Sequence, residues 1–402
     1  DVIICVHNAF EDVRNCLESI KKYTSSPYNL IIVDDGSDEP TKTFLSDFAT
    51  TESNCTLIRI ENALGYTLAA NIGMRASKAP YLVLLNSDTI VGIQWIDRMY
   101  RAIIQNEKIG VVGPISNTAS WQSIPQLSEN GDWAINKLPS NLDPSRMSEL
   151  ISKYSGCIHP EVPLLNGFCM MIRKELINDI GYFDEDNFGL GYGEEDDFNL
   201  RAGAANWKKV IADDVYIFHA QSKSYSNERR YNLSKASGLK LRKKHNVDLI
   251  NECVEFMNPN RVMEGIRGRS KVMVEREEYL ERGRMDFFGK KLLFVLPVID
   301  AGGGANVIID ESRNMLQMGV DVNIFNLEKY KGGFLQSYPN IDIPLIFGDE
   351  NDLNKISDSF DAIVASANYS VEWLLPLKSR QNPPICGYYI QGFEPFIYPD
   401  DS

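Results

Sequence analysis

The stretch Leu30-Ile-Ile-Val-Asp-Asp-Gly-Ser37 decides the fold. It opens with a short apolar run and ends in two carboxylates and a Gly-Ser turn, which is typical of a buried strand that leads into a tight turn. Similar apolar runs occur at residues 2–6, 56–60 and 81–85, and stretches with helical periodicity separate them. Apolar strands that alternate with helices predict an α/β fold, in which helices cover both faces of a mostly parallel sheet.

Composition divides the chain into three regions. The alternating pattern covers residues 1–255, apart from a stretch at 114–165 that is rich in Ser, Asn, Pro and Trp and is expected to form loops around a site. Residues 256–290 carry dense mixed charge, which predicts a helical linker. A second α/β pattern at 291–402 predicts a Rossmann-like unit. The chain opens on a strand without a methionine, so we expect a fragment or a processed form.

Charge and composition exclude several classes of function. The chain has 402 residues and a net charge of −14, so we expect no nucleic acid partner. Its apolar runs are shorter than the roughly 20 residues that span a bilayer. Seven scattered cysteines without a C-x-x-C motif argue against a zinc finger and a disulfide framework. They favour a reducing compartment, and therefore a cytoplasmic α/β enzyme.

Polar and acidic side chains follow the ends of two predicted strands. Asp34 and Asp35 follow the second strand, and Asn86, Ser87 and Asp88 follow the fourth. The carboxyl ends of parallel strands meet at one edge of a sheet, so we expect these groups to converge there. The first pair could accept hydrogen bonds from a base and a ribose, and Asp88 could hold a divalent cation against a diphosphate. In both cases the alternative is a capping role at the next helix.

A third acidic cluster lies in the middle of the chain. Seven acidic residues fall between positions 184 and 197, four of them consecutive at 194–197. Neighbouring carboxylates raise one another's pKa, so one of the four could act as a general base towards a hydroxyl group. The alternative is a helix N-terminus, where acids are common. His219 follows a strand predicted at 215–218, and is either structural or part of the same site.

In their order along the chain, these stretches resemble the inverting GT-A glycosyltransferases of family 2, and more narrowly their bacterial rhamnosyltransferase-like branch. The resemblance covers residues 1–255 and implies a GT-A nucleotide-sugar-binding domain. The matching stretches are residues 3–8, 31–37, 62–66, 70–73, 84–89, 166–168, 181–185, 193–201 and 218–219.

The resemblance implies a donor site at the edge of the sheet. Asp35, with Asp34 nearby, would contact the nucleotide base and the ribose, and Asn71 would line the donor pocket. Asn86 and Ser87 would bind the donor as part of the family's D-x-D element. Asn86 is a departure, because it stands where the family has the first Asp of that element.

The same element implies a metal site. Asp88 is the last residue of D-x-D and would bind Mg²⁺ or Mn²⁺ that bridges the diphosphate. His219 would be a further ligand. Because Asn86 replaces the first Asp, we expect Asp88 to provide most of the coordination.

The family's E-D-x-D-x-x-x-R element aligns with residues 194–201, which implies that Glu195 is the general base. Glu stands here where the family usually has Asp, so Asp196 stays a second candidate. Trp121 and Trp133, in the irregular stretch, could stack on acceptor sugar rings or pack within their loops. The residues expected to contact the acceptor or support the site are Gly167, Phe168, Glu194, Asp197 and Arg201.

Residues 291–402 resemble the N-terminal half of a family 4 GT-B glycosyltransferase, on the stretches 293–297, 302–304 and 389–396. In that fold the nucleotide sugar binds mainly to the C-terminal lobe, which is absent here. The resemblance therefore implies that this unit is inactive as it stands, and that the natural protein is longer and bifunctional.

The implied function is a metal-dependent, inverting transfer of a sugar, rhamnose among the candidates, from a nucleotide-diphosphate donor. The acceptor would be a glycan or lipid-linked glycan of a growing bacterial surface polysaccharide, made at the inner face of the cell membrane with peripheral membrane contact. One alternative is a non-catalytic glycan-binding or scaffold protein derived from a transferase. The other is a sugar-phosphate nucleotidyltransferase, whose glycine- and basic-rich loop is missing at residues 6–10.

Overall fold

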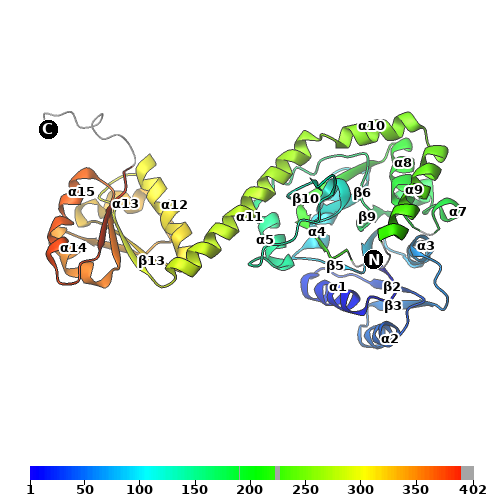
Figure 1. Ribbon diagram of the computed structural model, residues 1–402, viewed down its shortest axis with the longest axis horizontal. Coiled ribbons are helices and arrows are strands. Elements are labelled where there is room, and N and C mark those ends of the chain that lie inside the picture. Colours follow the sequence, from blue (N-terminus) through cyan, green and yellow to red (C-terminus); the bar gives the residue numbers. More distant parts are fainter. Residues whose placement is uncertain (190, 222–226, 391–402) are drawn as a thin grey trace. The chain divides into compact units, whose positions relative to one another are not determined.

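The computed structural model describes residues 1–189, 191–221 and 227–390, without the side chains of 227–234. The chain folds into two compact units, Asp1–Val274 and Glu275–Ser402 (Figure 1). The division lies within helix α11 (Arg261–Phe287), inside the stretch whose charge pattern predicts a helical linker. Each unit contains a sheet with helices, as the alternating patterns predict.

A seven-stranded sheet forms the centre of the first unit, in the order β10-β6-β9-β4-β1-β2-β3. Its strands are β1 (Val2–Val6), β2 (Leu30–Asp35), β3 (Cys55–Ile60), β4 (Tyr81–Asn86), β6 (Ile109–Ile115), β9 (Cys169–Arg173) and β10 (Lys208–Tyr216). Neighbouring strands are parallel, except that β9 runs antiparallel to both β4 and β6. The predicted mostly parallel sheet is therefore confirmed.

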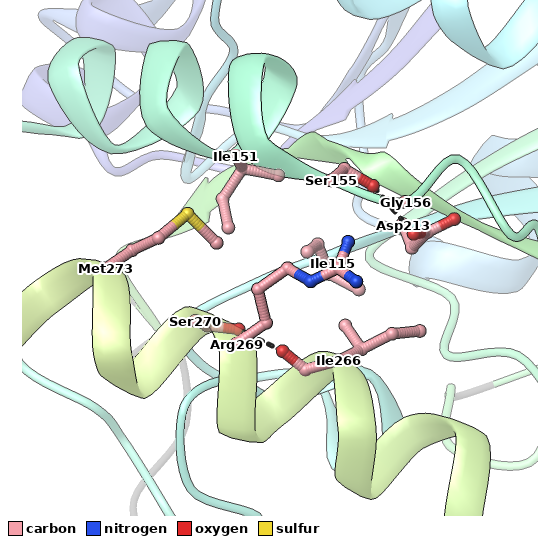
Figure 2. A pocket seen from close by; sticks show the side chains of 9 residues that line it. All are labelled: Ile115, Ile151, Ser155, Gly156, Asp213, Ile266, Arg269, Ser270 and Met273. Atoms are coloured by element: carbon pink, nitrogen blue, oxygen red, sulfur yellow. Dashed lines mark hydrogen bonds between the residues drawn. The ribbon is translucent and has the colours of Figure 1, made fainter. Parts of the chain in front are cut away.

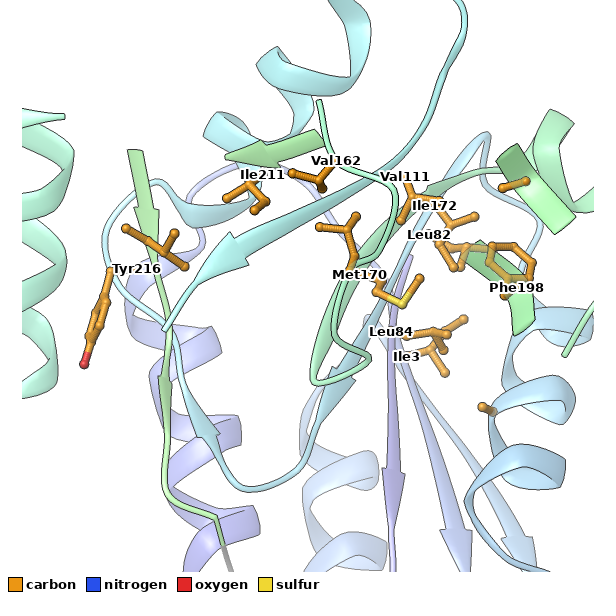
Figure 3. Close-up of a cluster of buried hydrophobic side chains, with 14 of the residues drawn as sticks. Ile3, Leu82, Leu84, Val111, Val162, Met170, Ile172, Phe198, Ile211 and Tyr216 are labelled. Carbon is orange, nitrogen blue, oxygen red and sulfur yellow. The ribbon is translucent and has the colours of Figure 1, made fainter. Parts of the chain in front are cut away.

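Apolar cores cover both faces of this sheet. Because side chains alternate along a strand, β1 places Ile3 on one face and Ile4 on the other. On the Ile3 face, Leu84 of β4 and Met170 of β9 pack into the same core as Phe198 of α8 (Figure 3). The helices of this unit before α11 are α1 (Phe10–Tyr23), α2 (Thr41–Thr51), α3 (Tyr66–Ala76), α4 (Trp95–Ile104), α5 (Pro144–Tyr154), α6 (Lys174–Ile180), α7 (Glu185–Phe188), α8 (Glu194–Ala204), α9 (Asn227–Lys244) and α10 (Val247–Met257).

Two strands differ from those expected from the sequence. The strand expected at 215–218 starts earlier, as β10, because Asp213 and Asp214 are buried within it and interrupt its apolar pattern. Beyond β10, residues Phe218–His219 form β11, which pairs with β5 (Thr89–Ile90). The pattern does not predict β6, since its Gly113 and Pro114 are residue types that strands usually exclude.

The first half of α11 belongs to the first unit. The guanidinium of Arg267 is buried, and donates from Nε to the Ser123 carbonyl (3.1 Å) and from Nη2 to the Trp121 carbonyl (2.6 Å). This half of the helix is thus more than a solvated connection, because it completes a core. Its apolar side chains in that core are Met263, Ile266 and Met273.

A five-stranded parallel sheet, in the order β14-β13-β12-β15-β16, forms the second unit. Its strands are β12 (Lys291–Val295), β13 (Asp321–Leu327), β14 (Leu345–Gly348), β15 (Ala362–Ala365) and β16 (Ile385–Tyr388). Its helices after α11 are α12 (Gly303–Gln317), α13 (Lys331–Ser337), α14 (Glu350–Ile356) and α15 (Asn368–Glu372). A parallel sheet with helices agrees with a Rossmann-like unit. Of the stretch 389–396 that resembles family 4, residues 391–396 lie outside the described residues.

A chain that ends at residue 255 should be less stable than one that ends at 274. The shorter chain loses Met263, Ile266 and Met273, and burial of each such side chain stabilises a fold by about 1.5–3 kcal/mol. We expect the midpoint of urea unfolding to be clearly lower for the shorter chain, measured by circular dichroism. Equal midpoints for the two chains would contradict a structural role for this half of α11.

Candidate functional site

The predicted site residues gather at one edge of the first sheet. The parallel strands β1, β2, β4, β6 and β10 all end there, and the antiparallel β9 begins there. The backbone N–H of Asn86, at the end of β4, donates to the carbonyl of Phe168, just before β9 (2.8 Å). Asp35, Asp88 and His219 lie at or just beyond strand ends on this edge. The convergence expected from the sequence is therefore present.

The two aspartates at the end of β2 are held by the protein's own groups. The buried carboxylate of Asp34 accepts a hydrogen bond from the guanidinium of Arg59. The carboxylate of Asp35 accepts from the backbone N–H groups of Leu64 (2.7 Å) and Gly65 (2.9 Å). Together they anchor β3 and the loop before α3 to the end of β2. Their contact with a nucleotide stays a prediction.

Asn71 ties α3 to the segment before α7. Its side chain is fully buried, and Nδ2 donates to the carbonyl of Phe183 (2.9 Å) and to the carboxylate of Glu185 (2.7 Å). Its Oδ1 accepts from the backbone N–H of Phe183 (3.1 Å). In this structure Asn71 positions residues 183–185, and its place in the donor pocket stays a prediction.

Asp88 and His219 meet, although they are far apart in the sequence. The pairing of β5 with β11 brings Nε2 of His219 to 3.3 Å from Oδ1 of Asp88. The His219 ring stacks on Phe168, with centroids 5.3 Å apart and planes 17° apart. Asn86 and Ser87, on the same turn as Asp88, are half-buried.

The hydrogen bonds of His219 suit a metal ligand. Its Nδ1 lies 3.0 Å from the carbonyl of Thr118, which can only accept, so Nδ1 carries the proton. Nε2 then faces the Asp88 carboxylate, and whenever it carries no proton its lone pair and the carboxylate oxygen could hold a cation between them. Two ligands in adjacent positions on a divalent ion lie about 3 Å apart, close to the observed 3.3 Å. The described residues contain no cluster of three or more such ligands.

The first turn of α8 reaches the same region. Glu195 packs on Gly167, where an added Cβ would lie 3.2 Å from the Cβ of Glu195. Gly193, in a left-handed conformation (φ +97°) that favours glycine, precedes the helix, and its N–H donates to Oε2 of Glu195 (3.2 Å). Through the turn at 167–168, Glu195 is thus connected to the strand end that leads to Asp88.

Burial raises the pKa values of three carboxyl groups on this turn. Burial raises the pKa of Glu194, and the charge of Glu195 raises it further. Among the described residues, Oε2 of Glu194 has no hydrogen-bond partner, which suits a protonated carboxyl group. Burial also raises the pKa of Glu195, and burial together with the Glu195 charge raises the pKa of Asp196 to about 8. Carboxylates of this kind are suited to accepting a proton near neutral pH.

The surroundings of Asp197, in contrast, favour its ionised form. Its carboxylate is fully buried and accepts from Arg201 Nε (2.8 Å), Lys244 Nζ (2.7 Å) and His245 Nε2 (2.7 Å). Burial alone would raise the pKa of Asp197, but Lys244, His245 and Arg201 together lower it below its usual range. Asp197 and Arg201 therefore support α8, one of the two roles expected of them.

Sequence reasoning missed three side chains around α8. Lys244 and His245 come from the end of α9 and close around Asp197. The third is Tyr66, whose pKa is raised well above its usual range by burial and by nearby acidic groups, Cys5 and Glu194 among them. The basic run at 242–245 was the signal available for the first two, because a buried aspartate requires cations.

A small cavity lies outside this cluster of residues. Ile151 of α5, Asp213 of β10 and Ile266 of α11 line it (Figure 2), and none of the predicted site residues does. The carboxylate of Asp213 accepts from Oγ of Ser155 (2.6 Å) at this place. The acids at the edge of the sheet, and not this cavity, therefore form the candidate site.

Comparison with known proteins places the first part of the chain in a family. Residues 1–181 match the model of the family described as glycosyl transferase family 2. These residues form a family 2 glycosyltransferase domain. The enzyme class predicted from the motifs is confirmed for this domain, which contains Asp35 and Asp88.

The family 2 glycosyltransferase domain has several curated relatives. Glycosyltransferase AglE of Haloferax volcanii is 26% identical over 220 residues, which cover 54% of this chain and 66% of the relative. Glycosyltransferase GlyG of Streptococcus pneumoniae is 27% identical over 116 residues, 29% of this chain and 38% of the relative. The chain thus spans less than two thirds of either relative. Among solved structures, a mannosyltransferase from Pyrobaculum calidifontis in complex with GDP-Man and Mn²⁺ is 14% identical to this chain and matches it with a TM-score of 0.45. The match covers 84% of this chain and 83% of the mannosyltransferase chain.

The raised pKa of Glu194 predicts how stability depends on pH. The folded state keeps the Glu194 proton to a higher pH than the unfolded chain does, so this stabilisation is complete below the unfolded pKa and is lost as pH rises through the folded pKa. Glu194→Gln keeps the shape and removes the titration. We expect it to reduce the loss of unfolding free energy between pH 4.5 and pH 8, measured by urea denaturation.

Asp197→Asn is the matched control with the opposite sign. The lowered pKa of Asp197 contributes stability above the unfolded pKa, which is lost as pH falls. This variant should therefore be most destabilised, relative to the wild type, at pH 8. An unchanged pH dependence in Glu194→Gln would contradict a protonated Glu194 in the fold.

Proposed function

We propose that the first unit transfers a sugar from a nucleotide-diphosphate donor to a hydroxyl group of a glycan, with inversion at the sugar. The observation that carries this proposal is the meeting of Asp88 with His219, beside the turn on which Glu195 packs, at the edge of the first sheet. Asp88 and that turn lie within the residues that match family 2. A cation-binding pair for the diphosphate and a carboxylate for the hydroxyl proton are the groups that direct displacement uses.

In the proposed reaction, the acceptor oxygen attacks the anomeric carbon on the side opposite the leaving nucleoside diphosphate. Glu195 accepts the proton of that hydroxyl group, with Asp196 as the second candidate. Asp88 and His219 would hold Mg²⁺ or Mn²⁺, which supplies positive charge for the diphosphate. Asp35 keeps the loop before α3 in place, so the donor meets a prearranged edge.

We also propose a bacterial surface polysaccharide, free or lipid-linked, as the acceptor. Two relatives from Staphylococcus epidermidis support this class by their names, a teichoic acid poly(glycerol phosphate) polymerase and a poly-β-1,6-N-acetyl-D-glucosamine synthase. Rhamnose as the sugar rests on the motif resemblance. Contact with the inner face of the membrane rests on the lipid-linked acceptor. In the described part of the chain, no helix combines the length and the apolar character needed to cross a bilayer.

For the second unit we propose the N-terminal half of a family 4 GT-B fold. The parallel sheet and the glycine-rich turn that leads into α12 support it. Under this proposal the transfer reaction belongs to the first unit, and residues 291–402 are inactive as they stand.

Release of nucleoside diphosphate from a panel of nucleotide sugars, with a glycan mixture as acceptor, tests the transfer. We expect release from one donor with Mn²⁺, and loss of release with EDTA. Asp88→Ala should lower the rate at least about 100-fold, because it removes charge stabilisation of the leaving group. Asp47→Ala, which removes an exposed carboxylate on α2, should leave the rate unchanged.

Two results would contradict this proposal in different ways. Full metal-dependent turnover in Asp88→Ala would overturn the metal assignment. No release, together with no metal-dependent binding of any nucleotide sugar, would instead favour a non-catalytic glycan-binding protein.

The two base candidates can be separated by isosteric amides. Loss of a general base typically slows a reaction by about 10²–10⁴-fold, so Glu195→Gln should lower kcat by that factor and Asp196→Asn by much less. The remaining activity of Asp196→Asn should keep a kcat that rises with pH, because burial raises the pKa of Glu195. If Asp196→Asn abolishes turnover while Glu195→Gln costs less than about tenfold, Asp196 is the base.

A further inference from the structure

Two tryptophans form an edge-to-face pair beside the candidate site. The rings of Trp121 and Trp133 lie with centroids 4.8 Å apart and planes 81° apart. Trp121 is half-buried against the first core, whereas 42% of Trp133 is exposed. In this arrangement Trp121 supports a ring that presents apolar surface to solvent. An exposed tryptophan held in this way is unexplained by the fold.

One side of the pair is bonded to the turn on which Glu195 packs. Trp121 lies in the short helix η1 (Ser120–Gln122). Within η1, Gln122 Oε1 accepts from the backbone N–H of Asn166 (2.6 Å), and Ser120 Oγ accepts from Asn166 Nδ2 (3.1 Å). Asn166 directly precedes Gly167, which contacts Glu195. The position of Trp121 is therefore set by the same turn as that of the base candidate.

The other side is bonded to the metal-ligand candidates. Nδ2 of Asn117 donates both to the carbonyl of His219 (3.0 Å) and to the carbonyl of Ile135 (3.2 Å). Trp133, on β8 (Asp132–Trp133), is two residues from Ile135, so their backbones are at most about 7 Å apart. The aromatic pair is thus connected through Asn117 to the backbone of His219, and through η1 and Asn166 to the turn on which Glu195 packs.

The loop that carries Trp121 is held rigidly. The buried Arg267 donates to the carbonyls of Trp121 (2.6 Å) and Ser123 (3.1 Å). Asn136 donates from Nδ2 to the carbonyls of Asn117 and Gln126 (both 2.8 Å). A surface that is fixed before binding loses little entropy when a ligand arrives, which favours binding of a weakly interacting group such as a sugar.

We propose that Trp133, supported by Trp121, is the subsite for the acceptor sugar, where the C–H face of a pyranose ring stacks on the indole. This inference rests on the proposed function, because it assigns the acceptor side of the same site. An acceptor whose hydroxyl group is deprotonated by Glu195 has its ring near that carboxylate, and the aromatic pair is bonded through η1 and Asn166 to the turn on which Glu195 packs.

The spacing of the strands separates this subsite from the nucleotide base. Asp35, the expected contact of the base, ends β2, whereas η1 follows β6. Between β2 and β6 lie β1, β4 and β9, so four strand spacings of about 4.8 Å separate the two strand ends by about 19 Å. Asp88, at the end of β4, lies between them. Trp121, and with it the paired ring of Trp133, therefore lies on the opposite side of Asp88 from the expected contact of the base.

Saturation-transfer difference NMR on the full chain tests this assignment, with the methyl pyranosides of glucose, galactose, mannose, rhamnose and N-acetylglucosamine as probes. We expect at least one probe to bind the wild type. Trp133→Ala should weaken that binding at least about tenfold, which corresponds to about 1.4 kcal/mol, and Trp133→Phe should retain most of it. Tyr100→Ala, which removes a similarly exposed ring (44%) from α4, should bind as the wild type does.

Three outcomes would overturn the subsite: no probe binds the wild type, Trp133→Ala binds as the wild type does, or Trp133→Ala weakens UDP or GDP binding by the same factor. The third would assign the ring to the nucleotide base. Failure of the proposed function is a different result, in which the wild type releases no nucleoside diphosphate. Pyranoside binding that depends on Trp133 would then identify a glycan-binding protein.

Discussion

The reversed direction of β9 is the constraint on which the candidate site depends. In a fully parallel sheet, the residues before a strand would lie at the opposite edge from the residues after its neighbours. Because β9 runs antiparallel to β4, the turn at 167–168 arrives where β4 ends, and Phe168 accepts the hydrogen bond of Asn86. That turn provides the ring on which His219 stacks and the glycine on which Glu195 packs. One strand reversal thus joins the metal-ligand candidates to the base candidate.

The four consecutive acids at 194–197 show how one helix turn can hold two kinds of carboxylate. Asp197 is buried against three hydrogen-bond donors, of which Arg201 and Lys244 are cationic, and it is stabilised as an anion. Glu194 is buried without a cation or a hydrogen-bond donor at Oε2 among the described residues, so its neutral form is favoured. The ionised Asp197 fixes the helix, and the weaker acids on its first turn stay available for proton transfer. Within a single helix turn, one carboxylate thus has a structural role, while its neighbours have the raised pKa values suited to proton transfer.

Much of the sheet could be predicted from the sequence, because its strands are apolar runs that end in acids or turns. The strand β6 could not, since Gly113 and Pro114 are residue types that strands usually exclude. In the structure β6 lies between β10 and β9, and a Cβ at Gly113 would collide with the side chain of Gln122. The placement of Asp34 and Asp88 at a common edge followed from the expectation of parallel strands, whose carboxyl ends meet at one edge of a sheet. The contact of Asp88 with His219 required the two-residue strands β5 and β11, which are too short to leave a pattern. Likewise Lys244 comes from a distant helix, and nothing near Asp197 in the sequence indicates it.

The bonds of Asp35 have a consequence for how the preference for a nucleotide can diverge. Its carboxylate holds the loop before α3 through the main-chain N–H groups of Leu64 and Gly65, and any residue other than proline supplies such a group. The conformation of the loop is therefore independent of most of its side chains, and Leu64 itself is exposed. Under the proposed function, substitutions in residues 61–64 can alter what the loop offers to a nucleotide base while the backbone around it stays in place. Evolution of a new donor preference is thus expected to begin in this loop, with the two aspartates unchanged.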